Sequence, residues 1–301
     1  MDHEQQSSPR QTLSYIRDLL QSRGMSPKSK MGQNFLIDLN LVDLMLESSE
    51  LSPTDCVLEV GTGTGGLTSR LSDGAGAVFS VELDGDFHRM ASEVLAERSN
   101  VKLMKADILE NKNKLNPDVI QGWDAWMIQH ACVQRKMIAN LPYVVATPVI
   151  ANLLITEIPI ERMVVMLQWE LAERLVAEKG TKDYSALSVL VQGLADVEII
   201  RRLAPSVFWP RPKVDSAIVR IRPNAEKRAR IPNVVKFRAF LRDLYTHRRK
   251  NLRQALAGWP TGRKDKKEVD ARLEELGIDG TLRAETMDLT THLKLSEAFG
   301  E

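Results

Sequence analysis

A short apolar strand that runs directly into a glycine-rich turn constrains this sequence more than any other feature. Residues 56–60 are mostly apolar, and Gly61-Thr62-Gly63-Thr64-Gly65-Gly66 follows them, ahead of a helical pattern that starts near Leu67. Glycines in such a turn let the backbone pass close to a ligand, because no Cβ is in the way. The pattern indicates nucleotide binding, but alone it fits dinucleotide-dependent dehydrogenases about as well as methyltransferases.

Strand-like and helix-like patterns alternate over most of the chain. Further strands are predicted at residues 78–82, 101–105, 136–139, 163–167, 195–203 and 214–221, and helices at 12–23, 39–46, 87–97, 170–178 and 186–194. This alternation predicts a Rossmann-like α/β sheet, mostly parallel, with helices on both faces. After Pro223 only helical patterns remain, at 234–256 and 267–276. We therefore expect a disordered tail at 1–11, an α/β domain at 12–225 and a small all-α domain at 226–301.

Bulk composition excludes several classes of protein. The chain of 301 residues has two isolated cysteines, Cys56 and Cys132, and five scattered histidines, so we expect no disulfide scaffold and no metal site. The polar first ten residues argue against a secretory signal. No apolar run reaches the roughly 18–20 residues that a membrane helix needs. These features predict a cytoplasmic protein that does not enter membranes, and nothing in them requires more than a monomer.

The charge is distributed unevenly although the net charge is only +1. Residues 199–267 hold 20 lysines and arginines but four acidic residues, whereas the rest holds 21 basic and 36 acidic residues. A basic region of this strength predicts an anionic partner, with nucleic acid the natural candidate and a merely solvated face the alternative. The candidate RNA-binding residues are Lys28, Lys30, Arg211, Lys213, Arg248, Arg249 and Lys250. We expect the last three to lie on a helix that docks by an apolar face.

Two acidic residues at strand ends narrow the choice of nucleotide ligand. Glu82 lies 21 positions after Gly61 at the end of the second strand, where a carboxylate can accept both hydroxyls of a ribose. Asp107 ends the third strand, where it could accept from an adenine amino group. A dehydrogenase has no systematic need for the second acid, so the combination favours S-adenosylmethionine. The alternative is that both are ordinary strand-end caps.

The segment Asn140-Leu141-Pro142-Tyr143 after the fourth strand suits chemistry on an exocyclic amine. The lone pair of such an amine is delocalised into the ring, so acceptors must hold its two hydrogens and leave the lone pair directed at the methyl donor. The Asn140 oxygen and the Leu141 carbonyl could do this, with Pro142 stiffening the turn and Tyr143 stacking on the base. Phe208 is a second candidate platform for an extruded base, or else a core aromatic.

These motifs together resemble the ribosomal RNA adenine N6-dimethyltransferases (KsgA type), from about residue 12 to residue 300. Besides the segments above, the resemblance rests on Glu82-Leu83-Asp84, on Asp107-Ile108-Leu109, and on residues 30–36 (KMGQNFL), 57–68 (VLEVGTGTGGLT), 207–220 (VFWPRPKVDSAIVR) and 247–252 (HRRKNL). It implies S-adenosyl-L-methionine as cofactor, with cofactor contacts from Asn34, Leu36, Gly61, Glu82, Asp107 and Asn140. Gly63 in the glycine turn and Ile108 beside Asp107 are further candidate cofactor contacts. The resemblance implies a base site formed by Asn140, Leu141, Pro142 and Tyr143, to which the residues themselves add Phe208 as a candidate.

The reaction implied by this resemblance is the transfer of four methyl groups to two adjacent adenosines near the 3′ end of 16S rRNA during ribosome biogenesis. The implied partners are small-subunit rRNA and the pre-30S subunit. Three features depart from the family pattern: Met31, the run Val144-Val145-Ala146, and a long segment at 111–135 with Trp123 and Trp126, which we expect to be an extra surface helix or a lid.

Three other functions remain open at this point. One is methylation of 23S rRNA by the related enzymes that confer macrolide resistance; the basic C-terminal region and the PRPKVDS stretch favour the small subunit instead. Another is an assembly or transcription-related binding protein that kept the fold and lost activity, against which the intact Asn140–Tyr143 segment argues. The third is a nicotinamide oxidoreductase, which leaves that segment and the basic region unexplained.

Overall fold

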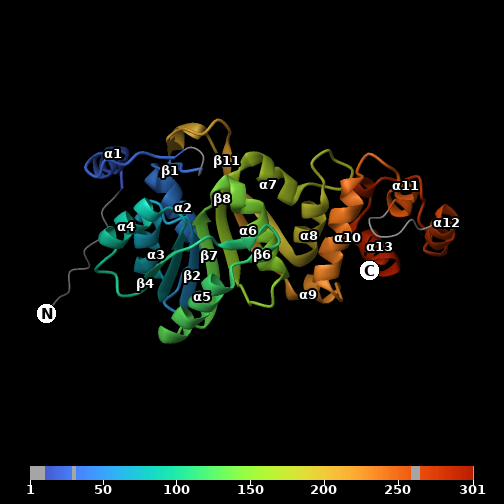
Figure 1. Cartoon of the computed structure of the whole chain (residues 1–301), viewed down its shortest axis with the longest axis horizontal. Helices are drawn as coiled ribbons and strands as arrows, with labels where there is room; N and C mark the ends of the chain where they lie inside the picture. Colours follow the sequence, from blue (N-terminus) through green and yellow to red (C-terminus); the bar gives the residue numbers. More distant parts are fainter. Residues whose placement is uncertain (1–10, 29–31, 259–264, 301) are drawn as a thin grey trace. The chain divides into compact units, whose positions relative to one another are not determined.

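The computed structural model describes residues 11–28, 32–258 and 265–300, and it confirms the α/β prediction (Figure 1). A seven-stranded sheet has the order β4-β3-β2-β7-β8-β11-β9. Its strands are β2 (Asp55–Val60), β3 (Ala77–Glu82), β4 (Val101–Lys105), β7 (Gln134–Asn140), β8 (Arg162–Gln168), β9 (Ala195–Leu203) and β11 (Ser216–Pro223). All are parallel to their neighbours from β4 to β8, and β11 runs antiparallel to β8.

The strand order reverses between β2 and β7. From β2 the chain moves outward to β3 and β4, and then returns to pair β7 with the other side of β2. The carboxyl ends of β2 and β7 are therefore neighbours, and in doubly wound sheets ligands bind in the crevice at this switch point. The glycine turn follows β2 and the Asn140 segment ends β7, so the topology brings the two motifs together.

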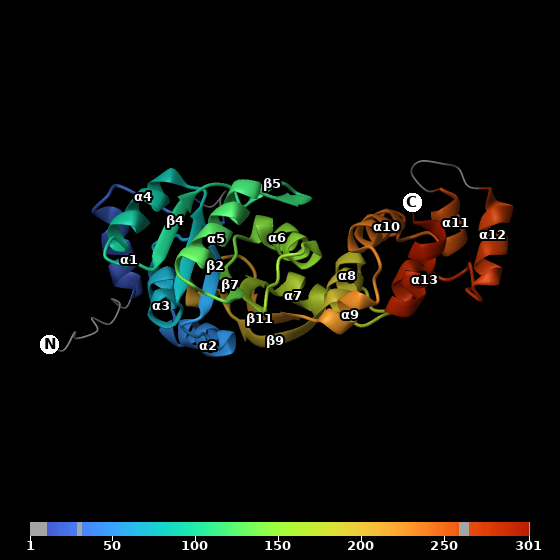
Figure 2. The same cartoon turned by 90° about the horizontal axis from the view of Figure 1, so that it is seen from below.

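Helices cover both faces of the sheet (Figure 2). On one side lie α2 (Leu39–Ser49) and α3 (Gly66–Gly74), and on the other lie α5 (Pro117–Gln129) and α6 (Tyr143–Ile155). Every residue of strands β2 and β3 is buried between these two layers of helices. Burial on both faces explains why the sequences of the two strands are mostly apolar. Two further helices of the α/β domain are α1 (Leu13–Gln21) and α4 (Gly85–Val94).

Two short strand pairs accompany the large sheet in the described residues. The hairpin β5 (Leu109–Asn111) with β6 (Lys114–Leu115) follows β4. The second pair, β1 (Phe35–Leu36) with β10 (Phe208–Trp209), is antiparallel and aligns Leu36 with Phe208. This pairing places the 30–36 motif beside the 207–220 motif, although the two are far apart in the sequence.

The chain divides into two compact units. The first unit combines the chain up to Trp169 with the later segment Glu198–Arg222. The second unit combines Glu170–Val197 with Pro223–Glu301. Residues 170–197, which the sequence assigned to the α/β domain, thus belong with the C-terminal helices. Helix α8 (Ala186–Leu194) packs against α10 (Val234–Thr246) and α13 (Leu289–Phe299), and Asn224 N–H donates to the Leu194 carbonyl at 2.8 Å.

The helices of the second unit are short. They are α7 (Trp169–Val176, beginning at the end of the first unit), α8 (Ala186–Leu194), α9 (Ala225–Ala229), α10 (Val234–Thr246), α11 (Leu252–Ala257), α12 (Lys266–Glu275) and α13 (Leu289–Phe299). Two 3₁₀ turns, at Pro205–Val207 in the first unit and Ala284–Thr286 in the second, complete the described elements. The single helix expected at 234–256 is wrong. It breaks between α10 and α11, where Asn251 caps α11 by accepting from Gln254 N–H.

The segment 111–135 is neither a surface helix nor a lid. Helix α5 packs against β2 and β3, and Trp123 at its centre has no exposed area. It is the crossover helix between β4 and β7, so the sheet requires it. In the sequence, Trp123 and Trp126 suggest an insertion, because nothing local shows that they are core residues. Their role in filling the core becomes visible only when the sheet is in place.

We expect Trp123→Ala to lower the free energy of unfolding by about 3–5 kcal/mol, because it would leave a large cavity against the sheet. Ile128→Ala on the same helix is the matched control: Ile128 is 77% exposed, and its loss should change stability by less than about 0.5 kcal/mol. Urea denaturation of both variants measures this. Equal stabilities would show that α5 does not belong to the core.

Candidate cofactor and adenine site

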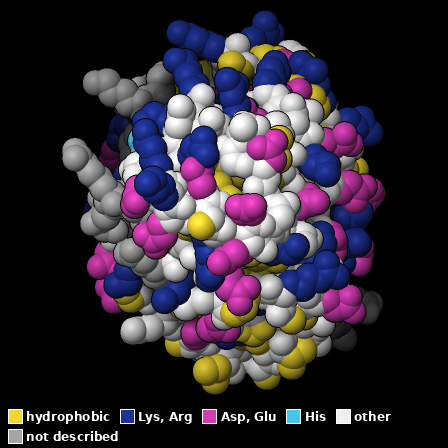
Figure 3. Space-filling model, turned by 90° about the vertical axis from the view of Figure 1, so that its right-hand side faces the viewer, with side chains coloured by type: hydrophobic (Ala, Val, Ile, Leu, Met, Phe, Trp, Pro, Cys, Tyr) yellow, Lys and Arg dark blue, Asp and Glu magenta, His cyan; other side chains and the backbone are white. Residues whose placement is uncertain are grey.

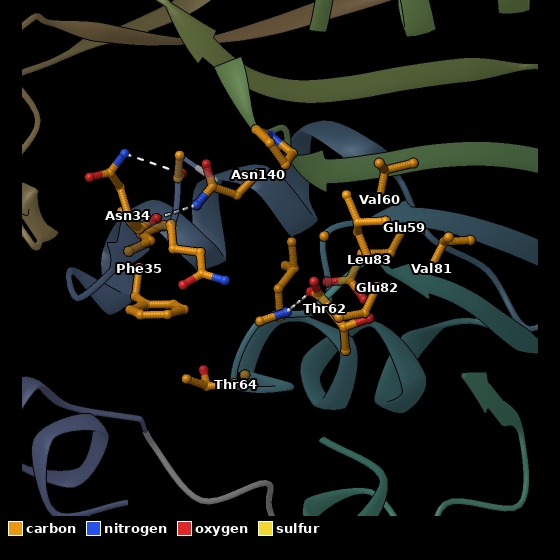
Figure 4. Close-up of a pocket in the computed structure, with 18 of the residues that line it drawn as sticks. Asn34, Phe35, Glu59, Val60, Thr62, Thr64, Val81, Glu82, Leu83 and Asn140 are labelled. Atoms are coloured by element: carbon orange, nitrogen blue, oxygen red, sulfur yellow. Dashed lines mark hydrogen bonds between the residues drawn. The ribbon is translucent and has the colours of Figure 1, made fainter. Parts of the chain in front are cut away.

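One cavity of about 380 Å³ lies at the switch point of the sheet (Figure 4). All eight residues that the sequence assigned to the cofactor line it: Asn34, Leu36, Gly61, Gly63, Glu82, Asp107, Ile108 and Asn140. Pro142 also lines it, whereas Leu141, Tyr143 and Phe208 do not. The cavity therefore joins the glycine turn, three successive strand ends and the 32–36 segment.

Glycine is required in the turn for two separate reasons. Gly61 and Gly63 both have positive φ, of 88° and 55°, which residues with a Cβ rarely adopt. A Cβ on Gly61 would also lie 3.3 Å from Pro142 Cδ, and one on Gly63 would lie 3.2 Å from the Phe35 ring. The turn after β2 is thus packed tightly against both the Asn140–Tyr143 segment and β1.

Glu82 is held in place by backbone donors. Its Oε2 accepts from Gly63 N–H and its Oε1 from Asp84 N–H, both at 2.9 Å. Burial raises the pKa of this carboxyl, while the two N–H groups favour its charged form and oppose the rise. The side chain is directed into the cavity from the end of β3 (Figure 4), where it can accept from the hydroxyls of a ribose.

Glu59 is a second cavity carboxyl, which the sequence analysis did not single out. Its Oε2 accepts from Ser80 Oγ and Thr68 Oγ1, each at 2.6 Å. The other oxygen, Oε1, is buried and has no partner among the described residues. Burial raises the pKa of Glu59 to about 8, with Glu82 nearby adding to the rise, so the side chain is mainly neutral near pH 7.

Asp107 and Ile108 close the cavity at the end of β4. Asp107 is exposed, and its Oδ1 accepts from Leu109 N–H at 2.9 Å, which fixes the turn. Ile108 is buried and offers an apolar surface at the cavity wall. A carboxylate beside an apolar surface suits an adenine ring, which presents an amino group at its edge and an apolar face.

Asn140 is oriented by the 32–36 segment. Its Nδ2 donates to the Asn34 carbonyl at 2.9 Å, and Asn34 Nδ2 in turn donates to the Gly32 carbonyl at 3.3 Å (Figure 4). This bond uses one hydrogen of the amide NH2 and directs the nitrogen end of the amide toward Asn34, which leaves the amide oxygen available as an acceptor for a ligand. The sequence analysis predicts this oxygen as the acceptor for one hydrogen of an exocyclic amine.

Tyr143 and Leu141 flank the cavity without lining it. Tyr143 begins α6, and its hydroxyl is 2.7 Å from Ser216 Oγ at the start of β11. Burial raises the pKa of the Tyr143 hydroxyl, so it is neutral at physiological pH. Leu141 N–H donates to the Met166 carbonyl at 3.1 Å, which ties the segment to β8.

The structure does not support Phe208 as a stacking platform. Phe208 is 3% exposed and belongs to a core cluster with Met166, Leu203 and Ile218. Phe208 is aligned with Leu36 across β10 and β1, and Leu36 packs against the same core cluster, which explains this burial. The alternative reading of Phe208 as a core aromatic therefore holds in this conformation.

The candidate RNA-binding residues fall into three groups. Lys28 is committed to Asp84 and Asp86, at 2.7 Å and 3.3 Å, so its charge is largely compensated; Lys30 lies outside the described residues. Arg211 and Lys213 are exposed in the loop after β10. The remaining three, Arg248, Arg249 and Lys250, lie in the turn between α10 and α11 and not on a helix, and Arg248 donates to the Lys182 carbonyl. On the face drawn in Figure 3, lysines and arginines gather mainly in the upper part, with acidic side chains interspersed below.

Gln11 is a cavity residue that the sequence analysis missed. It was expected to end a disordered tail, and residues 1–10 of that tail lie outside the described residues. Gln11 itself is buried: its Nε2 donates to the Thr64 carbonyl at 3.1 Å, and its Oε1 accepts from Thr64 Oγ1. No sequence signal distinguishes this glutamine from its polar neighbours.

Two further features were sought among the described residues: a cluster of metal-ligating side chains and a membrane-spanning helix. Within 11–28, 32–258 and 265–300, no group of three or more histidine, cysteine or acidic side chains is placed to hold an ion. Over the same ranges, no helix has the length and apolar character to cross a membrane.

We expect Glu59→Gln to stabilise the ligand-free protein more strongly as pH rises. The folded chain holds a proton on Glu59 up to about pH 8, whereas the unfolded chain loses it near 4.5, so this site's contribution to stability falls across that window. Glutamine does not titrate, and its oxygen can still accept from Ser80 and Thr68. Thermal unfolding at several pH values should show the variant gaining on the wild type between pH 4.5 and 8. The exposed Glu97→Gln is the control, and a pH-independent difference for Glu59→Gln would contradict the raised pKa.

Comparisons with solved structures agree with the fold. A dimethyladenosine transferase from Plasmodium falciparum matches with a TM-score of 0.69 and 24% identity, covering 86% of this chain and 94% of that one, which supports the fold alone. The 23S rRNA methyltransferase ErmE matches with a TM-score of 0.59 and 26% identity, covering 88% of this chain and 99% of that one.

Comparisons with known sequences identify the family. A family model described as ribosomal RNA adenine dimethylase matches residues 24–293. Two proteins named ribosomal RNA small subunit methyltransferase A are similar over nearly their whole length. That of Pelotomaculum thermopropionicum is 36% identical over 287 residues, 94% of this chain and 95% of that protein. That of Geobacillus kaustophilus is 37% identical over 289 residues, 94% of each. With the cavity, the Asn140 segment and the fold in agreement, the chain belongs to the ribosomal RNA adenine dimethylase family.

Proposed function

We propose that this chain transfers methyl groups from S-adenosylmethionine to the N6 atoms of two adjacent adenosines near the 3′ end of 16S rRNA, in the pre-30S subunit. One observation carries the proposal. The Asn140 amide is fixed by the Asn34 carbonyl, and its oxygen is presented at the same cavity that holds the glycine turn and Glu82. Donor and acceptor sites are thus adjacent at one switch point.

The cavity residues fit this cofactor. Cβ atoms on Gly61 and Gly63 would crowd Pro142 and Phe35. Only glycine at these two positions therefore lets the turn pass this close to its neighbours. Glu82 would hold the ribose hydroxyls, and Asp107 with Ile108 would hold the adenine. When bound, the cofactor supplies a methyl group on a sulfonium, which is already an activated leaving group.

The role of the protein at the reacting amine is alignment. Asn140 Oδ1 would accept one N6 hydrogen and the Leu141 carbonyl the other, which leaves the lone pair of the amine directed at the methyl donor. Pro142 restricts the backbone that presents this carbonyl, and its ring packs against Gly61. No strong general base is needed: the N–C bond would form as the sulfonium S–C bond breaks, and the methylated nitrogen, now cationic and acidic, would release one proton to solvent.

The choice of small-subunit over 23S rRNA rests on the curated relatives. Those with 36% and 37% identity carry the small-subunit name, whereas the 23S enzyme is 26% identical. Mapping the modified base after reaction with whole ribosomal subunits separates the two substrates: dimethyladenosine in 16S rRNA is expected, and dimethyladenosine in 23S rRNA would transfer the proposal to the other subunit.

We expect Asn140→Ala to lower kcat by about a hundredfold or more, the usual scale for losing one aligned hydrogen-bond group at a reaction centre. The assay is transfer of labelled methyl groups to undermethylated small subunits, with dimethyladenosine as product. Asn113→Ala, a surface substitution outside the cavity lining, is the matched control and should retain activity. Full activity of Asn140→Ala would refute its amine-orienting role.

A separate binding measurement tests the cofactor assignment. Calorimetry should detect S-adenosylmethionine binding by the wild type and no binding of NAD. Failure to bind S-adenosylmethionine would favour a binding protein without activity, and NAD binding would favour an oxidoreductase.

A further inference from the structure

Beyond the cavity, a compact group of polar and aromatic side chains continues from the Asn140–Tyr143 segment. Tyr143 Oη is 2.7 Å from Ser216 Oγ, and Ser216 follows Asp215 in the chain. Asp215 accepts from Arg202 at two nitrogens, Nε at 2.8 Å and Nη2 at 2.6 Å. Its backbone carbonyl accepts from Trp169 N–H at 2.9 Å.

Arg202 lies over the Trp169 ring. Its guanidinium carbon is 4.4 Å from the ring centroid, closer than in the pairs Arg17–Trp209, Lys102–Trp126 and Arg135–Trp123, at 5.5–5.8 Å. The Arg202 side chain is nevertheless 56% exposed. The guanidinium is therefore fixed in orientation by an acid and a ring, while much of it still faces solvent.

Stability accounts for only part of this arrangement, because an exposed cation–π contact stabilises the fold modestly. A surface ion pair contributes little, and holding a long side chain flat costs conformational entropy. The arrangement provides a planar group that is already oriented before a ligand arrives. Binding to it therefore costs less conformational entropy than binding to a mobile arginine. Because Asp215 compensates the charge, the group is better suited to stacking than to neutralising a phosphate.

The position relates this plane to the reaction site. Trp169 directly follows β8, and β8 pairs with β7 so that Met166 is aligned with Asn140. Ser216, aligned with Gln168, starts the next strand. The Arg202–Trp169 pair therefore lies at the same edge of the sheet as Asn140, on the Tyr143 side and away from the glycine turn.

We propose that Arg202, held over Trp169 by Asp215, is a stacking platform for an RNA base that neighbours the target adenosine. Arginine planes and aromatic rings are the usual surfaces on which unstacked RNA bases rest. An adenosine can enter the cavity only if its local stacking is broken, and this surface replaces the stacking that a neighbouring base loses. The inference rests on the proposed rRNA substrate and adds a subsite to it.

The test compares Arg202→Ala, Arg202→Lys and Arg201→Ala in methylation of undermethylated small subunits. Arg201 is the matched control, because it precedes Arg202 in β9 and adjacent strand residues point to opposite faces. Both Arg202 variants should raise KM for the subunit about tenfold, the scale of one lost stacking contact, with unchanged affinity for S-adenosylmethionine. Arg201→Ala should change KM less than about twofold.

Salt dependence supplies a readout that a general charge effect would not reproduce. A lost stacking contact lowers subunit affinity at every salt concentration, whereas a lost phosphate contact reduces the slope of log affinity against log salt by about one. We expect an unchanged slope for Arg202→Ala. Rescue by Arg202→Lys, a reduced slope, or equal effects of Arg201→Ala and Arg202→Ala would each overturn the platform. An inactive wild type would instead refute the proposed function itself.

Discussion

The hydrogen bond from Asn140 Nδ2 to the Asn34 carbonyl is the interaction on which the site depends. It decides which end of the Asn140 amide is presented to a ligand, and it links the end of β7 to the 32–36 segment. The contact between Gly61 and the Pro142 ring adds the glycine turn to the same assembly. Three segments remote in the sequence are thereby linked at one wall of the cavity, and the alignment of two reactants requires groups that are held in place in this way.

The charges of the molecule are divided in a way that suits two different ligands. Glu82 and Asp107 line the cavity together with Glu59, which is mainly neutral near pH 7, and Arg70, which pairs with Asp43, is the one basic side chain among the described lining residues. An acidic cavity favours a cationic cofactor, and it disfavours the RNA backbone. Exposed basic residues such as Arg211 and Lys213 lie outside the cavity lining, where an anionic substrate can be met without competing for the cofactor site.

The features that could be predicted from sequence were those with a local cause. A buried parallel strand is apolar wherever it lies, and a turn with positive φ calls for glycine, so β2, β3 and the turn at Gly61 were recognisable. Because strand ends of a parallel sheet meet at one edge, Glu82, Asp107 and Asn140 could also be placed in one cavity. The family resemblance supplied what local rules could not, namely the prediction that Asn34 and Leu36 contact the cofactor; both line the cavity.

The features that could not be predicted depend on contacts between distant residues. The burial of Phe208 follows from its pairing with Leu36, and the commitment of Lys28 follows from Asp84, which is 56 positions away. Gln11 looks like part of a polar tail until Thr64 is brought beside it. The break after α10 lies in a basic run that has helical periodicity, and the Asn251 cap was overlooked within it.

The most direct measurement is a crystal structure of the protein with a bisubstrate analogue that joins adenosine N6 to the cofactor through its methyl position. The account predicts that the N6 atom lies within hydrogen-bond distance, about 3 Å, of both Asn140 Oδ1 and the Leu141 carbonyl, with the cofactor ribose on Glu82. An analogue bound with N6 remote from Asn140, or with the Asn140 amide reversed and its nitrogen toward the base, would contradict it.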